Sequence, residues 1–166
     1  MVFLLFTYPF QNVPCGGWKN FIDIIHTHPP SLPLYVVINP DSGSGPAHMQ
    51  PNFDWPPCIA QLKNASTKVH VVGYVHTSWG AQPQSVVNTN VSTYAEWDGT
   101  YRPEGIYFDE IANDAANLTY HRALADKSRE LFGNNSVVIL NPGTVVDPRY
   151  SEFADIIITD EKDFVS

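Results

Sequence analysis

Short apolar runs recur along the chain at nearly even spacing. They are rich in Val, Ile, Leu and aromatic residues and occupy residues 2–8, 34–39, 69–76, 105–110, 136–141 and 154–161. Most begin one βα unit apart, which is about 30 residues. Because the runs are almost continuously apolar rather than alternating, they predict parallel strands that are covered on both faces.

Amphipathic segments lie between these runs. The spacing of their apolar residues predicts helices at about 17–27, 54–63, 83–97 and 114–131. The last connection, 142–153, is too short for more than one turn of helix. Strands that alternate with helices predict an α/β fold.

Composition limits the kind of protein. A chain of 166 residues with 43% hydrophobic residues can build one sizeable core, so we expect a single domain over residues 1–166. Nine basic and 17 acidic side chains give a net charge of −8, which argues against nucleic acid and anionic membrane surfaces as partners. No apolar run approaches the roughly 20 residues that cross a bilayer. The apolar opening MVFLLFTYPF predicts a first strand rather than a signal peptide.

Two further features concern the compartment. Four Asn-x-Ser/Thr sequons, more than this composition should give by chance, favour secretion or association with a cell wall, and they begin at Asn64, Asn90, Asn117 and Asn134. They fall on helices or on loops that lead into strands. We expect glycans there not to block the mouth of the fold, which is the edge formed by the carboxyl ends of the strands. Cys15 and Cys58 follow strand ends and are compatible with one disulfide or with two free thiols.

Polar and aromatic residues gather where the predicted strands end. In parallel α/β folds these ends meet at one edge, where ligands bind. Hydroxyl, amide and imidazole groups can hydrogen-bond sugars, and an indole can stack on a pyranose ring. The substrate-binding candidates are therefore Tyr8, Asn39, His76, Trp79 and Asn141.

Acids also close two of the strands, and they suggest acid/base chemistry on a glycosidic bond. Asp109 and Glu110 end the run GIYFDE, and Asp160 and Glu161 end ADIIITDE. Neighbouring side chains on a strand point to opposite faces, so the first pair can share one mouth only if the backbone turns there. We expect one of Asp109 and Glu110 to be catalytic, with Glu161 as the second catalytic carboxyl group. Asp160 is expected to be a loop acid. An acid pair that merely caps a helix is the structural alternative.

Two other motifs do not predict sites. His26 and His28 lack a further ligand at metal-binding spacing, and the stretch 41–46, DSGSGP, lacks the Lys of a phosphate-binding loop. We therefore expect no metal and no cofactor.

Several of these motifs together resemble one known family. The segments LYVVINPDSGSGP, VVGYVHTSWGAQP, GIYFDEI and ADIIITDE, in this order, are similar to the spherulin-4-like family of secreted glycoside hydrolases. The resemblance implies a (β/α)8 barrel that cleaves α-1,4-linked, galactosamine-containing polysaccharide at bonds in the interior of the polymer. It places the family's acidic pair on Asp109 and Glu110 and its second glutamate on Glu161.

The number of strands departs from that pattern. A (β/α)8 barrel needs eight strands and at least about 200 residues, whereas six runs are visible, so we expect a TIM-like barrel truncated to about six βα units and incomplete at both ends. Expressed alone, such a chain should aggregate through its open edges, whereas the full-length protein should be a monomer. The alternatives are a carbohydrate-binding or coat protein without turnover, and a complete doubly wound sheet of flavodoxin type.

Overall fold

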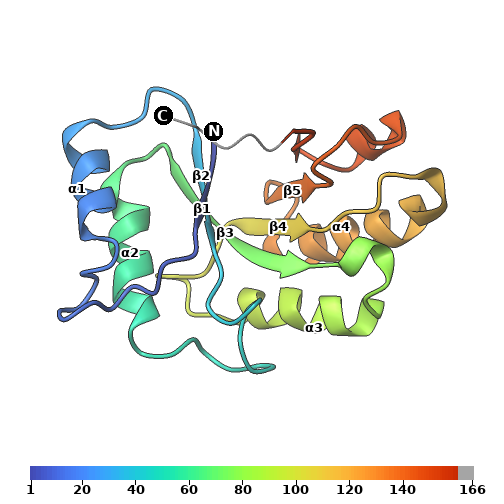
Figure 1. The fold of residues 1–166 in the computed structure, drawn as a ribbon. Helices are drawn as coiled ribbons and strands as arrows, with labels where there is room; N and C mark the ends of the chain where they lie inside the picture. Colours follow the sequence, from blue (N-terminus) through green and yellow to red (C-terminus); the bar gives the residue numbers. More distant parts are fainter. Residues whose placement is uncertain (161–166) are drawn as a thin grey trace.

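A computed structural model describes residues 1–160 as one curled, six-stranded parallel sheet with helices (Figure 1). The strands are neighbours in the order in which they occur in the sequence. Their bounds are β1 Val2–Leu5, β2 Leu34–Ile38, β3 Val69–His76, β4 Gly105–Asp109, β5 Val137–Asn141 and β6 Ile156–Ile157. This order contradicts the flavodoxin alternative, in which the strand order reverses at a switch point.

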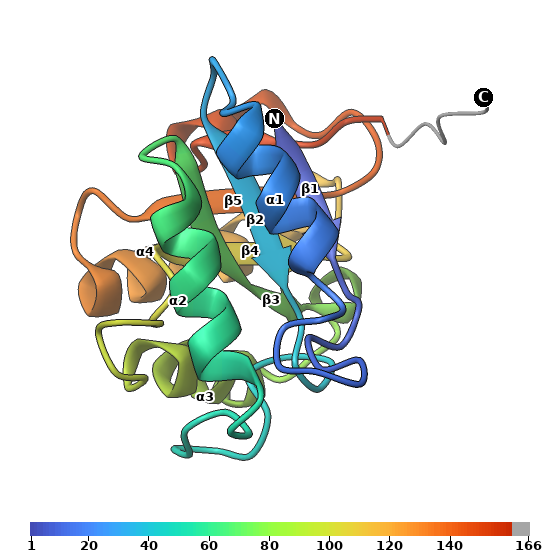
Figure 2. The ribbon, with the colours of Figure 1, turned by 90° about the vertical axis from the view of Figure 1, so that its left-hand side faces the viewer.

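Each of the first five strands is followed by a connection that returns to the same side of the sheet. The helices are α1 Lys19–Thr27, α2 Trp55–Ala65, α3 Gln84–Ala95 and α4 Leu118–Phe132, with 3-10 turns η1 Ser78–Gly80, η2 Ala115–Asn117 and η3 Pro148–Glu152. Figure 2 shows α1 and α2 side by side over the strands. No helix in residues 1–160 has the length and apolarity needed to cross a membrane.

The two faces of the sheet have different surroundings. Alternate strand residues such as Val71 and Phe108 are buried in the main core with the helices. The residues between them, among them Val72, Tyr107 and Ile139, form a smaller cluster on the opposite, concave face. A parallel sheet with helices on its outer face and side chains on its inner face is the arrangement of a half-barrel. The α/β prediction is thus confirmed, and closure into eight strands stays a prediction.

Two strands are shorter than the sequence predicts. The first ends at Leu5, so Tyr8 lies in the following loop, where the indole of Trp18 donates a hydrogen bond to the Thr7 carbonyl at 2.7 Å. The sixth covers only Ile156–Ile157, because β5 ends at Asn141 and Pro142 has no N–H to extend the ladder. Asp160 is outside any strand, as expected for a loop acid. Glu161 lies outside the described residues.

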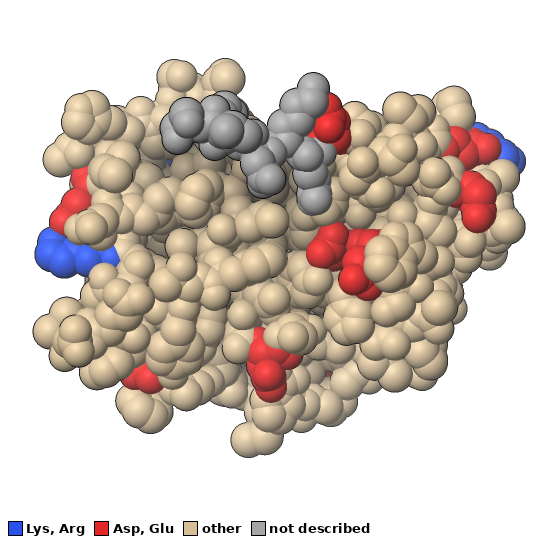
Figure 3. All heavy atoms as spheres, in the orientation of Figure 1, with Lys and Arg blue, Asp and Glu red and all other residues tan. Residues whose placement is uncertain are grey.

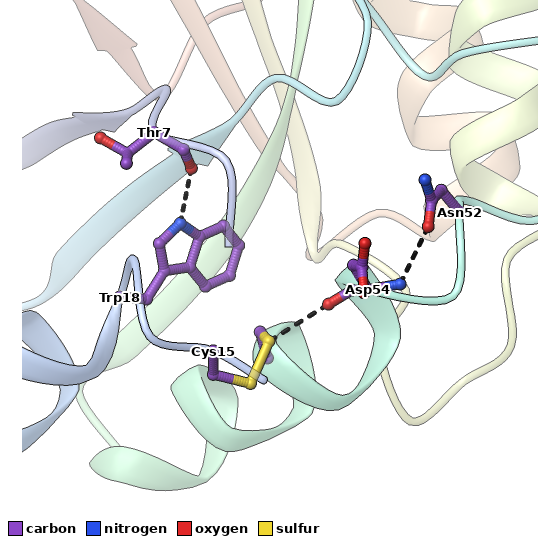
Figure 4. The surroundings of a disulfide bond; sticks show 6 residues. Thr7, Cys15, Trp18, Asn52 and Asp54 are labelled. Atoms are coloured by element: carbon purple, nitrogen blue, oxygen red, sulfur yellow. Dashed lines mark hydrogen bonds between the residues drawn. A yellow bond between two sulfur atoms is a disulfide. The ribbon is translucent and has the colours of Figure 1, made fainter. Parts of the chain in front are cut away.

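A disulfide joins Cys15 and Cys58, whose Cα atoms are 5.3 Å apart (Figure 4). It connects the loop after β1 to the first turns of α2. Both cysteines and the neighbouring Trp18 are buried. Of the two states that the sequence allowed, the structure contains the disulfide.

Candidate active site

Three predicted site residues stand side by side at the carboxyl edge of the sheet. His76 on β3 pairs in register with Asp109 on β4, which pairs with Asn141 on β5. Residues of equal register in parallel strands project on the same face, and these follow the concave-face residues Tyr74, Tyr107 and Ile139 by two positions. The structure therefore brings together one acid, one imidazole and one amide at the mouth of the half-barrel.

The carboxylate of Asp109 is held by three donors. Its Oδ1 accepts hydrogen bonds from the side-chain amide of Asn141 at 2.8 Å and from the backbone N–H of Glu110 at 2.9 Å. Its Oδ2 accepts one from the hydroxyl of Tyr74 at 2.9 Å. Burial, followed by this hydrogen bond, raises the pKa of Tyr74, so the phenol remains a donor at neutral pH. The carboxyl group of Asp109 is accordingly a fixed hydrogen-bond acceptor.

Glu110 reaches the same mouth because the backbone turns at this residue. Its φ is 55°, a left-handed conformation that non-glycine residues seldom adopt. Its Oε2 lies 3.8 Å from Nδ1 of His76, and its side chain is 33% exposed. The turn required for the two acids to share one site is therefore present, and Glu110 is held more loosely than Asp109.

Trp79 stands beside the acids in a strained turn. It has φ of 52°, donates its backbone N–H to the carbonyl of Glu110 at 2.7 Å, and is 63% exposed. It lines a cleft of about 270 Å³ together with Ala112, Asn113 and Asn117. Asn117 begins a sequon, so a glycan on this residue would stand at the mouth, contrary to the expectation from the sequence.

Tyr8 and Asn39 bond to the long loop after β2 instead. The Tyr8 hydroxyl donates to Oδ2 of Asp54 at 2.6 Å and accepts from Nδ2 of Asn52 at 3.0 Å. Tyr8 lines a separate cleft of about 230 Å³. Oδ1 of Asn39 accepts the N–H of Gly43 at 2.8 Å. In the structure these two predicted residues therefore organise a loop at the same edge, and their contact with a substrate stays a prediction.

A larger cavity, of about 660 Å³, lies at the other end of the sheet. Its lining includes Glu104 and Ser136, which immediately precede β4 and β5, and the cations Lys63 and Arg102. Ligands of parallel α/β proteins bind at the carboxyl edge. We therefore place the candidate site at the acids and not in this cavity.

Charge on the surface is predominantly negative. Figure 3 shows separate acidic groups on one face, with Lys and Arg only at its left and right margins. Within residues 1–160, no group of three or more His, Cys, Asp or Glu side chains is placed to hold a metal ion.

Comparison with known proteins assigns the chain to a family. The model of spherulation-specific family 4 matches residues 1–166. The chain belongs to this family. The family resemblance inferred from its motifs is thereby confirmed.

Two known proteins are similar to this chain. Spherulin-4 of Physarum polycephalum is 31% identical over 153 residues, which are 90% of this chain and 42% of that protein. The crystal structure of Aspergillus clavatus Sph3, in complex with GalNAc, superposes with a TM-score of 0.85 at 32% identity. That match covers 96% of this chain and 64% of the Sph3 chain. The chain thus spans less than two thirds of either relative.

Two residues of the site were not predicted from the sequence. Tyr74 lies within β3 and supplies a donor to Asp109, and Thr77 follows the strand and bonds to both acids' carbonyls. Strand periodicity could have revealed Tyr74, because it shares a face with His76 two residues later. Thr77 lies in the segment VVGYVHTSWGAQP that carries the family resemblance, but its contacts depend on the turns that follow it and could not be predicted.

Proposed function

We propose that this protein carries the catalytic site of a glycoside hydrolase. Its substrate is an α-1,4-linked, galactosamine-containing polysaccharide, which it cleaves at internal bonds. The observation that carries the proposal is the left-handed turn at Glu110. It places a second carboxyl group at the mouth beside the anchored Asp109, and strain of this kind collects at functional sites. The resemblance to the GalNAc-bound Sph3 structure supports an amino sugar as part of the substrate.

Glu110 is our candidate for the group that transfers a proton. Its carboxyl group is partly exposed, and its nearest cationic or imidazole neighbour in the described chain is His76 at 3.8 Å. As general acid it would protonate the glycosidic oxygen as the bond to the anomeric carbon breaks. Nδ1 of His76 lies 3.3 Å from the hydroxyl oxygen of Ser78, and on substrate binding the imidazole would hydrogen-bond Glu110 or a sugar hydroxyl.

Asp109 has a different role in this mechanism. Three hydrogen bonds fix the position of its carboxyl group. A fixed carboxylate of this kind stabilises the positive charge that develops on the sugar ring in the transition state. Glu161, which the resemblance implies as the second glutamate, would act as nucleophile or as base on a water molecule.

The remaining predicted site residues would bind the polymer. Trp79 presents an exposed indole to the cleft of about 270 Å³, and an indole suits the apolar face of a pyranose. Asn141 lies beside Asp109 and can reach the same sugar, whereas Tyr8 and Asn39 would contact sugar units further along the polymer.

The disulfide fits an extracellular protein, because such bonds persist in oxidising compartments.

Substitutions of the three acids test this proposal. In the full-length protein, Asp109→Asn, Glu110→Gln and Glu161→Gln should each lower kcat on an α-1,4-galactosaminoglycan by about 100-fold or more. Glu130→Gln is a matched control, because Glu130 is an exposed glutamate of α4 that pairs with Lys127. It should retain wild-type activity. Full activity in all three acid variants would contradict the proposed mechanism.

A further inference from the structure

Two left-handed backbone turns meet at the candidate active site. Glu110 has φ of 55°, and the consecutive residues Ser78, Trp79 and Gly80 have φ of 50°, 52° and 84°. Non-glycine residues keep such conformations only where surrounding contacts determine them. The contacts that hold these turns should therefore determine where the Glu110 carboxylate points.

Thr77 lies between the two turns and bonds to both. Its N–H donates to the carbonyl of Asp109 at 3.0 Å. Its hydroxyl lies 2.8 Å from the carbonyl oxygen of Glu110 and 3.1 Å from that of Asp109. Its own carbonyl accepts the N–H groups of Gly80 and Gln82, each at 3.1 Å. The residue is fully buried, so water does not compete for these bonds.

The carbonyl of Glu110 is thus fixed from two sides, by the Thr77 hydroxyl and by the N–H of Trp79 at 2.7 Å. Rotation of the peptide that follows Glu110 would break both bonds. It would also change the ψ of Glu110, whereas the φ of Glu110 depends on the preceding peptide, whose Asp109 carbonyl Thr77 also binds.

The geometry points to Thr77 as a positioning residue that holds Glu110 in its left-handed conformation. Thr77 offers the site only its hydroxyl and backbone, and both are bonded to the protein, so it acts through Glu110. The inference rests on the proposed function of Glu110 in proton transfer.

Thr93 provides a matched control within the same chain. It is also fully buried. Its hydroxyl donates to the carbonyl of Thr89 at 2.9 Å and accepts the N–H of His48 at 2.9 Å, both remote from the acids. Replacing either threonine with valine removes one buried hydroxyl at nearly constant volume, so general destabilisation should affect both variants.

The kinetic test compares Thr77→Val, Thr77→Ser and Thr93→Val in the full-length protein on an α-1,4-galactosaminoglycan. Thr77→Val should lower kcat by about 10- to 100-fold with little change in KM, because the acid is misplaced, while the other two variants stay within about twofold of wild type. Wild-type kcat in Thr77→Val, or an equal loss in Thr93→Val or Thr77→Ser, would overturn the positioning role.

Amide hydrogen exchange gives a second test that does not need turnover. The N–H of Trp79 should exchange about tenfold faster in Thr77→Val than in wild type, and at the wild-type rate in Thr77→Ser and Thr93→Val. An unchanged rate in Thr77→Val would overturn the inference. If the wild-type protein hydrolyses no such polymer, the proposed function fails, and the exchange rates alone decide whether Thr77 holds the turn.

Discussion

Asp109 and Glu110 are adjacent in the sequence but differ in how the protein holds them. Asp109 accepts three hydrogen bonds, one of them from the partly buried hydroxyl of Tyr74. Glu110 has a 3.8 Å contact with His76 and partial exposure to solvent. Hydrogen bonds fix the Asp109 carboxyl group in one position, whereas the Glu110 carboxyl group is free to turn towards a bound ligand. This difference supports the separate roles that we propose for the two acids.

His121 on α4 is a titratable residue that lies behind the site. It is buried, and its Nε2 accepts the backbone N–H of Ala112, at 3.3 Å, in the loop that follows the acids. Burial lowers its pKa from the ordinary 6.5 to about 4, and the charge of Asp114 opposes this only partly. His121 is therefore neutral in the folded protein at moderate pH.

The stability of the protein should consequently fall as the pH is lowered from about 6.5 to about 4. In this range the unfolded chain binds a proton at His121 that the folded chain does not, which costs up to about 3 kcal/mol. His121→Gln keeps an acceptor for Ala112 and should remove this part of the pH dependence. Denaturant unfolding at several pH values measures it, and identical slopes in wild type and variant would contradict the assignment.

The sequence predicted which residues stand side by side at the strand ends, but not the residues that hold Glu110 in its turn. His76, Asp109 and Asn141 each end an apolar run, so the rule that parallel strand ends share an edge placed them correctly. The turn at Glu110 could be stated only as a requirement, because its φ is set by Thr77 and Trp79. Tyr8 and Asn39 satisfy the same rule, yet bond to a loop whose path no local pattern fixes.

At the level of elements, strands and helices were predictable where periodicity was long. The second to fifth strands and all four helices lie close to their predicted ranges. The first and sixth strands were predicted too long, because their apolar residues continue beyond the backbone pairing. Tertiary contacts such as the Trp18 indole on Thr7 end the pairing and leave no local signal.

One close approach between elements depends on a glycine. A Cβ on Gly73 in β3 would lie 2.8 Å from two ring carbons of Tyr94 in α3. The ring cannot easily move, because Tyr94 is fully buried and its hydroxyl donates to the carbonyl of Ile38 at 3.3 Å. The small residue in β3 therefore allows α3 to pack against the sheet.

Gly73→Ala should accordingly lower the free energy of unfolding by about 1–3 kcal/mol through overpacking. Gly99→Ala is the control, since a Cβ there meets nothing within 4 Å. Chemical denaturation of the two variants, made in the full-length protein, measures the difference. Equal stability of both would show that α3 is not held at this distance from β3.

At the scale of the whole molecule, the described sheet is an open half-barrel. Within residues 1–160, β1 and β6 each pair with one neighbour only, and concave-side residues near β1 such as Phe6 are partly exposed. Unpaired strand edges favour association with other chains. Aggregation of residues 1–166 when expressed alone therefore remains the prediction, and the chain's match to 64% of Sph3 is compatible with it.

The Cys15–Cys58 disulfide should contribute substantially to the stability of the whole molecule. It links residues 43 positions apart, and removal of such a bond typically costs about 2–5 kcal/mol. A reductant should lower the midpoint of wild-type unfolding and leave that of a Cys15→Ser/Cys58→Ser variant unchanged. A wild-type midpoint that does not respond to reductant would contradict this contribution.

We propose above that the acids at the end of β4 hydrolyse an amino-sugar polymer. The most direct measurement follows new reducing ends over time in an α-1,4-galactosaminoglycan incubated with full-length wild-type protein and with Glu110→Gln, while polymer binding is measured in parallel. We expect steady release of fragments by wild type and binding without release by Glu110→Gln. Binding by both proteins with release by neither would contradict it and would identify a carbohydrate-binding protein on the same fold.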